Sequence, residues 1–412
     1  MVAAMTPMRL AIVATHPIQY YSPWFSHLAR LCDLEVFYAH RQTAEGQATA
    51  GFATPFEWDV PLLEGYAHRF LANRSRRPGL SHFGGCDTPE VGGVIGRGHF
   101  DAVVTLGWNK KSYLQAAAAA LLAGVPLLIR VDSQLQTPRG VGARLLKRAV
   151  YPCLLPWVAH YLSPGRRSDG YLRHYGVAHD RIHRLAHMVD TERFAHGAAA
   201  ARAGDAVAEL RATHGVAPNE FVFLFVGKLI PLKQPLLLLD AFRRLASAEP
   251  KAHLWIVGDG PLQEQFAALA ASCERASLLG FVNQARLPEV YAASDCLVLP
   301  SSEETWGLVV NEAFACGVPA IVSEQAGCAP DLIGPDTGWT VAADDASTLA
   351  RVMSTAHQRA ASLSRRALAA KTEAGSYATG AAQLLDAVRE IRGRRSQVAQ
   401  RRSGAQPSEQ RT

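Results

Sequence analysis

Two lysines, five residues apart, follow one of the most apolar runs in the chain. The run FVFLFVG (221–227) predicts a buried strand that ends at Gly227, with Lys228 and Lys233 in the loop before the next helix. Such a loop offers anions its backbone N–H groups and the positive end of the helix dipole. Two ammonium groups at this place would neutralise a diphosphate. The alternative is a pair of solvated lysines beside a loop.

Two carboxylates stand eight positions apart around the start of another predicted helix. The strand CLVLP (296–300) leads into the loop SSEETWG, so Glu304 precedes the helix and Glu312 lies about one and a half turns inside it. Glu304 alone could merely offset the helix dipole. Glu312 has apolar neighbours along the helix, so its carboxylate needs a partner. Sugar hydroxyls are suitable partners because carboxylates accept strongly from O–H groups.

A third strand, AHLWIVG (252–258), ends in a turn that contains Gly258 and Gly260. Glycine permits close approach of a ligand to the backbone, although a tight turn needs glycine for itself. The pattern is not G-x-G-x-x-G, because its sixth position is Gln263. A nicotinamide dehydrogenase is therefore disfavoured.

Short apolar runs alternate with helical patterns through both halves of the chain. This alternation predicts an α/β protein with two doubly wound, parallel-sheet, Rossmann-like domains that face each other across a cleft. The strands are expected at 9–15, 34–38, 101–107, 126–131, 160–163, 181–186, 221–227, 252–258, 276–280, 296–300 and 319–323. The Ala/Gly-rich stretch 195–210 is expected at the junction. We predict domains at 1–200 and 201–375, a helix at 376–392 that packs back across the domains, and a disordered basic tail at 393–412.

Composition excludes several classes of protein. The chain has 412 residues and a formal net charge of only +6, much of it in the last twenty residues, which does not indicate a nucleic-acid partner. Seven scattered cysteines with no C-x-x-C predict reduced thiols rather than disulfides or a zinc site. No apolar stretch is long enough to span a bilayer, and no signal peptide is recognised. We therefore expect the protein in the cytoplasm, with peripheral attachment to the inner face of the membrane as an alternative.

In combination, these motifs resemble glycosyltransferase family 4. The similarity covers about 220–335 and consists of Gly-Lys-x4-Lys, Gly-Asp-Gly-Pro, GFVNQ, LPSS, and Glu-x7-Glu with EAFACGVPAIVS; it is weaker over 8–190. The resemblance implies the GT-B fold and retaining transfer of a hexose from a nucleoside diphosphate sugar to a lipid-linked or saccharide hydroxyl. It also implies that the donor phosphate acts as the base in a front-face substitution. No D-x-D pair is present to hold a metal, so no metal or other cofactor is predicted.

The resemblance also implies roles for single residues. Lys228 and Lys233 would clamp the donor diphosphate, and Glu312 would bind the ribose. Glu304 and the backbone amides of 306–308 would position the sugar and its phosphate. The predicted catalytic residues are Lys228, Lys233, Glu304 and His16, and the predicted donor-binding residues are Lys228, Lys233, Gly258, Gly260, Phe281, Val282, Glu304, Trp306, Gly307, Leu308 and Glu312.

The acceptor side is expected at the ends of strands in the first half. The family usually has a Gly-rich loop after the first strand, and this chain has His16, Pro17 and Gln19 instead. His16 is either a structural histidine or an acceptor contact. The candidates on this side are His16, Gln19, Trp108, Asn109, Arg130 and Asp132, and His187 stays unassigned.

Other interpretations remain open. A nucleotide-sugar epimerase or phosphorylase would use the same scaffold, and a non-catalytic nucleotide-sugar sensor would keep the same pocket. The segment 140–162 mixes Arg144, Lys147 and Arg148 with apolar residues. It could dock on an anionic membrane, but the favoured interpretation is a core helix with a basic outer stripe.

Overall fold

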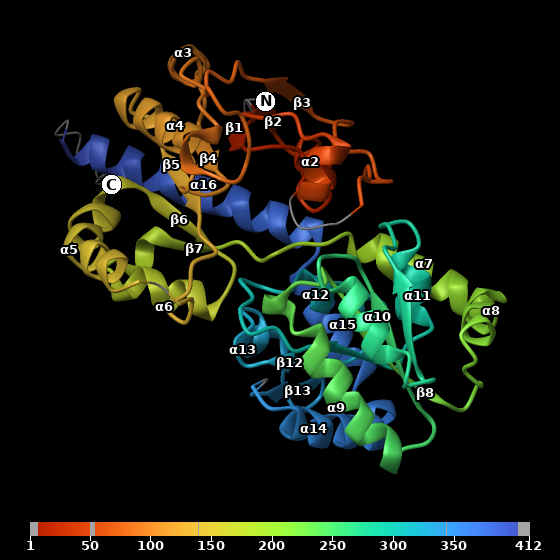
Figure 1. The fold of residues 1–412 in the computed structure, drawn as a ribbon. Coiled ribbons are helices and arrows are strands. Elements are labelled where there is room, and N and C mark those ends of the chain that lie inside the picture. Colours follow the sequence, from red (N-terminus) through yellow and green to blue (C-terminus); the bar gives the residue numbers. More distant parts are fainter. Residues whose placement is uncertain (1–6, 50–53, 139, 343, 403–412) are drawn as a thin grey trace, which may run out of the picture.

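The computed structural model describes residues 7–49, 54–138, 140–342 and 344–402, and its chain builds two parallel β-sheets with helices on both faces of each (Figure 1). The predicted architecture of two doubly wound domains is confirmed. Strand orders change direction at β1 and at β8, which begin the two halves. In such sheets, ligands bind beyond the carboxyl ends of the strands at this switch point.

The first sheet has the order β3-β2-β1-β4-β5-β6-β7. Its strands are β1 (Arg9–Ala14), β2 (Asp33–Tyr38), β3 (Ala67–Phe70), β4 (Ala102–Thr105), β5 (Leu127–Arg130), β6 (His160–Ser163) and β7 (Ile182–Arg184). The helices of this domain are α1 (Ser22–Leu28), α2 (Ala44–Thr49), α3 (Val91–Arg97), α4 (Lys111–Leu122), α5 (Val141–Val158) and α6 (Arg166–His174), with 3₁₀ turns η1 (Phe83–Gly85) and η2 (His179–Arg181).

The second sheet has the order β10-β9-β8-β11-β12-β13. Its strands are β8 (Phe221–Val226), β9 (Ala252–Val257), β10 (Ala276–Gly280), β11 (Cys296–Leu299), β12 (Ala320–Ser323) and β13 (Gly338–Val341). Its helices are α7 (Thr191–Ala203), α8 (Ala206–Thr213), α9 (Pro235–Ala248), α10 (Gln263–Ala270), α11 (Leu287–Ala292), α12 (Leu308–Ala315), α13 (Ala329–Leu332), α14 (Ala346–Arg359) and α15 (Arg365–Ala374), with η3 (Pro231–Lys233) and η4 (Ala360–Ser362).

Each sheet separates two apolar clusters, because its central strands are buried on both faces. The second sheet has the side chains of α7, α11 and α12 on one face and those of α9 and α14 on the other. Such continuous burial explains why the central strands read as unbroken apolar runs. The edge strands β3 and β13 were not predicted, because their side chains are only partly buried and their sequences lack that signal.

The junction between the domains lies earlier than predicted. The stretch 195–210 is mostly helical, within α7 and α8, and the side chain of Asp190 caps α7 by accepting from the backbone N–H of Arg193. Phe194 and Ala198 of α7 belong to the apolar core of the second domain. The chain therefore crosses between domains at about 185–190, before position 200.

The carboxy-terminal helix returns to the first domain and lies beneath its sheet (Figure 1). Residues of α16 (Tyr377–Arg402), including Leu384, Val388 and Ile391, join the core formed by β1, β2 and α1. The helix continues to Arg402, so the predicted disordered tail is wrong for 393–402. Residues 403–412 of that predicted tail lie outside the described residues.

Three further features bear on the class of protein. All seven cysteines are free and five of them are buried, as expected for reduced thiols. Within the described part of the chain, no helix is both long and apolar enough to cross a bilayer. The same described residues contain no cluster of three or more His, Cys, Asp or Glu side chains with the arrangement of a metal site.

Candidate active site

The loop after β8 brings two cations to the carboxyl edge of the second sheet. Lys228 follows Gly227 directly, and Lys233 ends the turn η3 just before α9 begins at Pro235. Gln234, which joins Lys233 to α9, has a left-handed backbone (φ 53°, ψ 44°), which is rare for a residue with a side chain. Burial lowers the pKa of Lys228, and the neighbouring charge of Lys233 lowers it further. A partly desolvated pair of cations favours an anionic ligand.

Gly258 and Gly260 let the loop after β9 pack against the loop that carries the lysines. Gly258 has φ +139°, and a Cβ atom there would lie 1.8 Å from the carbonyl oxygen of Gly227. A Cβ atom on Gly260 would lie 2.8 Å from the carbonyl oxygen of Leu229. Both glycines therefore fix the position of the lysine loop, and Gly258 also lines the pocket described below.

The loop between β11 and α12 places Glu304 against Lys233. Their side chains form an ion pair, and the Glu304 side chain is 12% exposed. Gly307 caps α12 with φ +103°, where a side chain would meet Leu299. Of the adjacent acids Glu303 and Glu304, the second lines the pocket.

Glu312 is a carboxylate with no solvent exposure. Its Oε2 accepts a hydrogen bond from the Tyr291 hydroxyl at 2.8 Å. Its Oε1 has no hydrogen-bond partner among the described residues. Burial raises the pKa of Glu312, although Tyr291 and the nearby Tyr20 act in the opposite direction. A buried oxygen without a donor is costly, so this side chain is ready for a ligand that brings one.

These side chains surround one pocket of about 400 Å³ between the two domains. The second domain contributes Lys228, Lys233, Gly258, Phe281, Val282, Glu304, Gly307, Leu308 and Glu312, and the first domain contributes Gln19, Tyr20 and Trp58. Its volume lies in the range of small-molecule sites. It combines two cations, two carboxylates and an apolar wall, which is what a ligand with phosphates, hydroxyls and a flat ring requires.

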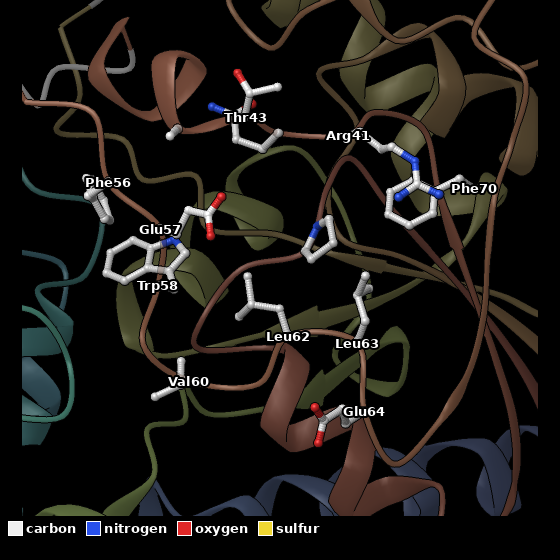
Figure 2. A pocket seen from close by; sticks show the side chains of 13 residues that line it. Arg41, Thr43, Phe56, Glu57, Trp58, Val60, Leu62, Leu63, Glu64 and Phe70 are labelled. Atoms are coloured by element: carbon white, nitrogen blue, oxygen red, sulfur yellow. The ribbon is translucent and has the colours of Figure 1, made fainter.

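A second pocket, of about 420 Å³, lies beside the first and belongs to the amino-terminal domain (Figure 2). Trp58 and Glu57 line one side of it, and Arg41 and Phe70 line the opposite side (Figure 2). The Arg41 guanidinium lies 3.9 Å from the Phe70 ring centre. Trp58 lines both pockets and thus stands between them.

The segment 54–60 of the first domain is held on the second domain across the cleft. The Phe56 ring packs on the Phe281 ring with centres 4.4 Å apart. The Asn283 amide donates to the Glu57 carbonyl at 2.7 Å, and the Thr54 N–H donates to Asp259 at 3.0 Å. These contacts position Trp58 over the first pocket.

Several predicted residues do not line either pocket. Arg130 is 1% exposed and donates to the carbonyls of Leu185 and Ala186 and to Asp132 at 3.1 Å. Asp132 in turn lies 3.2 Å from His187 Nε2. Burial opposes ionisation of Asp132, but His187 and Arg130 together hold its pKa below the ordinary range. Through the carbonyls of Leu185 and Ala186, this group holds the segment at which the chain crosses between the domains.

The remaining candidates also lie elsewhere. The Trp108 ring packs among aromatic rings, with its centre 6.0 Å from that of Tyr151 and 6.2 Å from that of Tyr161. The side chain of Asn109 is exposed. The Trp306 side chain is buried and donates to Asn311 at 2.9 Å. His16 Nδ1 lies 3.0 Å from the Thr15 hydroxyl. Burial lowers the pKa of His16 to about 4, and His40 contributes to this shift.

Sequence reasoning missed Tyr20, Trp58 and the whole second pocket. The run FEWDVPLLE (56–64) falls between recognised elements, and its density of aromatic and acidic residues was the available signal. No periodicity links this run to the second domain. Only the folded arrangement places it over the lysines.

Comparisons with known proteins agree with this arrangement. Residues 207–372 match the family model described as Glycosyl transferases group 1. A D-inositol 3-phosphate glycosyltransferase of Rhodococcus opacus is 38% identical over 184 residues, which are 42% of this chain and 40% of the relative. A second enzyme of that name, from Catenulispora acidiphila, is 35% identical over 187 residues, or 42% of each chain. The chain thus matches about two fifths of the length of these relatives.

Solved structures resemble the chain over nearly its whole length. Anabaena HepE, solved in complex with UDP and glucose, has a TM-score of 0.66 at 20% identity and covers 92% of this chain and 98% of its own. A glycosyltransferase from Rickettsia africae has a TM-score of 0.70 at 15% identity and covers 93% and 98%. At these identities the likeness shows the fold alone. The chain therefore has the two-domain GT-B fold, and its residues 207–372 match the Glycosyl transferases group 1 family.

Proposed function

We propose that the protein is a retaining, metal-independent glycosyltransferase. It moves a hexose from a nucleoside diphosphate sugar to a hydroxyl of a lipid-linked or saccharide acceptor, in the cytoplasmic synthesis of a cell-surface polysaccharide or glycoconjugate. The observation that carries the proposal is the pocket in which two lysines and two carboxylates converge at the carboxyl ends of the second sheet. The inositol phosphate glycosyltransferases that match this region support the reaction class.

The two lysines bind the diphosphate of the donor. Lys228 and Lys233 lie at the turn before α9, where charge and backbone N–H groups favour the same anion. They stabilise the negative charge that grows on the diphosphate as it departs, which is the part of the barrier that fixed cations lower most. In this role they replace a divalent metal.

The two carboxylates accept hydrogen bonds from hydroxyls of the donor. Glu312 Oε1 accepts from a ribose hydroxyl and thereby gains the hydrogen bond that it lacks in the chain alone. The apolar wall at Phe281 and Val282 suits the base. Anabaena HepE, which shares this fold, was solved in complex with UDP-glucose. Glu304, beside Lys233, orients the transferred sugar next to its phosphate.

The reaction exchanges one bond at the anomeric carbon for another on the same face. The bond to the diphosphate oxygen breaks, the bond to the acceptor oxygen forms, and the acceptor proton passes to the departing phosphate oxygen. Catalysis then consists of positioning and charge stabilisation, with no protein nucleophile. Trp58 and Tyr20 restrict the access of water from the side of the first domain.

The second pocket holds the acceptor. Glu57 and Glu64 offer carboxylates to its hydroxyls, and Trp58 and Phe70 offer flat apolar surfaces. Trp58 lines both pockets, so an acceptor in the second pocket would lie next to the donor. This assignment replaces the predicted acceptor candidates His16, Trp108, Asn109, Arg130 and Asp132; Gln19 lines the donor pocket instead.

One experiment separates this function from its rivals. The protein is incubated with a panel of nucleotide sugars, with and without lipid-linked and saccharide acceptors, and nucleoside diphosphate release and donor identity are measured. Acceptor-dependent release is expected. Interconversion of donors without release would indicate an epimerase, and nucleotide binding without any turnover would indicate a sensor.

A second experiment tests the lysine assignment. Lys233→Ala is expected to weaken binding of a nucleoside diphosphate by about tenfold to a hundredfold, because a charge-assisted contact is lost. Binding of the free nucleoside should hardly change. Lys251→Ala, at an exposed lysine of the same domain, is the matched control. Equal losses for nucleoside and diphosphate would contradict a phosphate contact.

A further inference from the structure

Helix α5 packs on the first domain along one narrow stripe. Leu155 is the only residue of the helix that is buried, and it is still 9% exposed. The Tyr151 ring lies 5.1 Å from the Tyr175 ring, and Lys147 Nζ donates to the Tyr171 hydroxyl at 3.4 Å. Positions 147, 151 and 155 are four apart and so share one face of the helix. The favoured interpretation of this segment as a core helix is therefore wrong.

A second face of α5, about 100° around the helix from this stripe, presents a row of apolar side chains to solvent. Leu146, Val150, Leu154 and Trp157 follow the spacing i, i+4, i+8 and i+11, which places them on one face. They are 65%, 41%, 42% and 74% exposed, respectively. Leu145, next to this row, is also exposed, at 63%. Single exposed leucines are ordinary, but a continuous apolar row marks an interaction surface.

The apolar surface continues onto the end of α4. Leu121 and Leu122 there are 50% and 90% exposed. A pocket of about 490 Å³ between the two helices is lined by Leu121 and Trp157 together with Arg181, Arg394 and Arg395. It lies at the amino ends of β5 and β6, whereas the donor pocket lies at the carboxyl ends of strands. The surface is thus separate from the proposed catalytic site.

The charge around this surface has one dominant sign. Helix α5 contains no Asp or Glu, and its basic residues are Arg144, Lys147 and Arg148. Arg144 and Arg148 on α5 are exposed. The nearby acids Asp180 and Glu390 both pair with Arg394 at the rim of the pocket. Two copies of so basic a surface would repel each other.

We propose that the exposed face of α5, with the end of α4, docks on an anionic phospholipid bilayer. An apolar row with a tryptophan and flanking arginines suits a helix that lies in the bilayer interface. The apolar side chains enter the boundary between headgroups and acyl chains, and the arginines bind lipid phosphates. The protein would then be held at the surface without any segment that crosses the membrane.

Vesicle sedimentation tests this proposal with the full-length protein. Binding is expected to vesicles of phosphatidylcholine with phosphatidylglycerol, to be weak on phosphatidylcholine alone, and to fall as salt rises. Arg144→Glu/Arg148→Glu is expected to lower binding to the anionic vesicles by about tenfold or more. Leu146→Glu/Trp157→Glu is expected to abolish it. Neither pair lines the donor pocket, so nucleoside diphosphate binding should persist and report correct folding.

Matched controls alter similar residues elsewhere. Leu31→Glu changes an exposed leucine of the same domain, and Arg351→Glu/Arg366→Glu changes two exposed arginines of the other domain. Both controls should bind vesicles as the native protein does. Absence of binding at low salt, or equal losses in the variants and controls, would overturn the proposal. Sedimentation as a dimer that Leu146→Glu/Trp157→Glu dissociates, without vesicle binding, would assign the surface to a second copy instead.

Discussion

Among the single residues of the donor pocket, Glu312 combines complete burial with an oxygen that has no donor. Glu312→Gln keeps the size of the side chain and an acceptor for Tyr291, but it weakens the acceptor offered to a ribose. Nucleoside diphosphate affinity, measured by titration calorimetry, is expected to fall about tenfold to a hundredfold. Thermal stability of the free protein should stay equal or rise, because burial disfavours the charged form.

Glu303→Gln is the control for that substitution, since Glu303 is the neighbour of Glu304 that does not line the pocket. It should leave the affinity unchanged. A Glu312→Gln variant that binds the nucleotide like the native protein would show that this carboxylate does not contact the donor.

His16 was predicted to be catalytic, and its effect on the pH dependence of stability shows whether its role is structural instead. Burial lowers its pKa in the folded protein to about 4, from the ordinary histidine value of about 6.5. The unfolded chain therefore binds the extra proton first, so this residue costs stability as the pH falls from about 6.5 toward 4. Replacing it removes that cost.

His16→Gln is expected to reduce the loss of unfolding free energy between pH 7 and pH 5 by about 1–2 kcal/mol. Urea denaturation at the two pH values measures the difference. His174→Gln, at an exposed histidine, controls for unspecific effects. An unchanged slope together with lost turnover would point to a catalytic role for His16 instead.

At the scale of elements, the site depends on how closely the loops after β8 and β9 approach. Gly258→Ala would place a Cβ atom 1.8 Å from the Gly227 carbonyl at φ +139°. The free energy of unfolding is expected to fall by more than about 2 kcal/mol. An alanine is strained at this positive φ, and the backbone at Gly227 must also move to make room for the Cβ atom. Donor affinity should fall too, because the displaced loop carries Lys228.

Gly317→Ala provides the comparison. This glycine also has a positive φ, +74°, but a Cβ atom there meets nothing within 4 Å. Its cost should be limited to about 1 kcal/mol of backbone strain, with donor affinity retained. Equal effects of the two substitutions in denaturant titrations would refute the close-packing argument.

At the scale of the whole molecule, the two domains meet through the segment 54–60. Trp58 lines both pockets, so Trp58→Ala joins them and admits water to the donor. Release of nucleoside diphosphate without acceptor is expected to rise relative to transfer. Chromatography of free and transferred sugar measures the ratio. Val60→Ala, in the same segment and lining only the second pocket, is the control; the same change of ratio in both variants would contradict a barrier at Trp58.

Much of the fold could be predicted because the spacing of apolar residues along the chain reflects which side chains of each strand or helix are buried. The central strands β8, β9 and β11 are buried on both faces, so their apolar runs were recognisable. The edge strand β13 and the helix α7 carry weaker patterns, since one side of each faces solvent or small residues. The end of α16 was placed too early because an exposed basic helix and a disordered basic tail have the same composition.

The sequence by itself determined the residues that end strands on the donor side. Lys228, Lys233, Glu304 and Glu312 could be predicted to meet, because the carboxyl ends of parallel strands share one edge of a sheet. Only the tertiary structure decided what faces them. Trp58 and Tyr20 reach the pocket from segments more than 160 residues away, and no local period specifies a contact across a cleft. It also decided that α5 lies at the surface, because burial depends on which faces neighbouring elements leave uncovered.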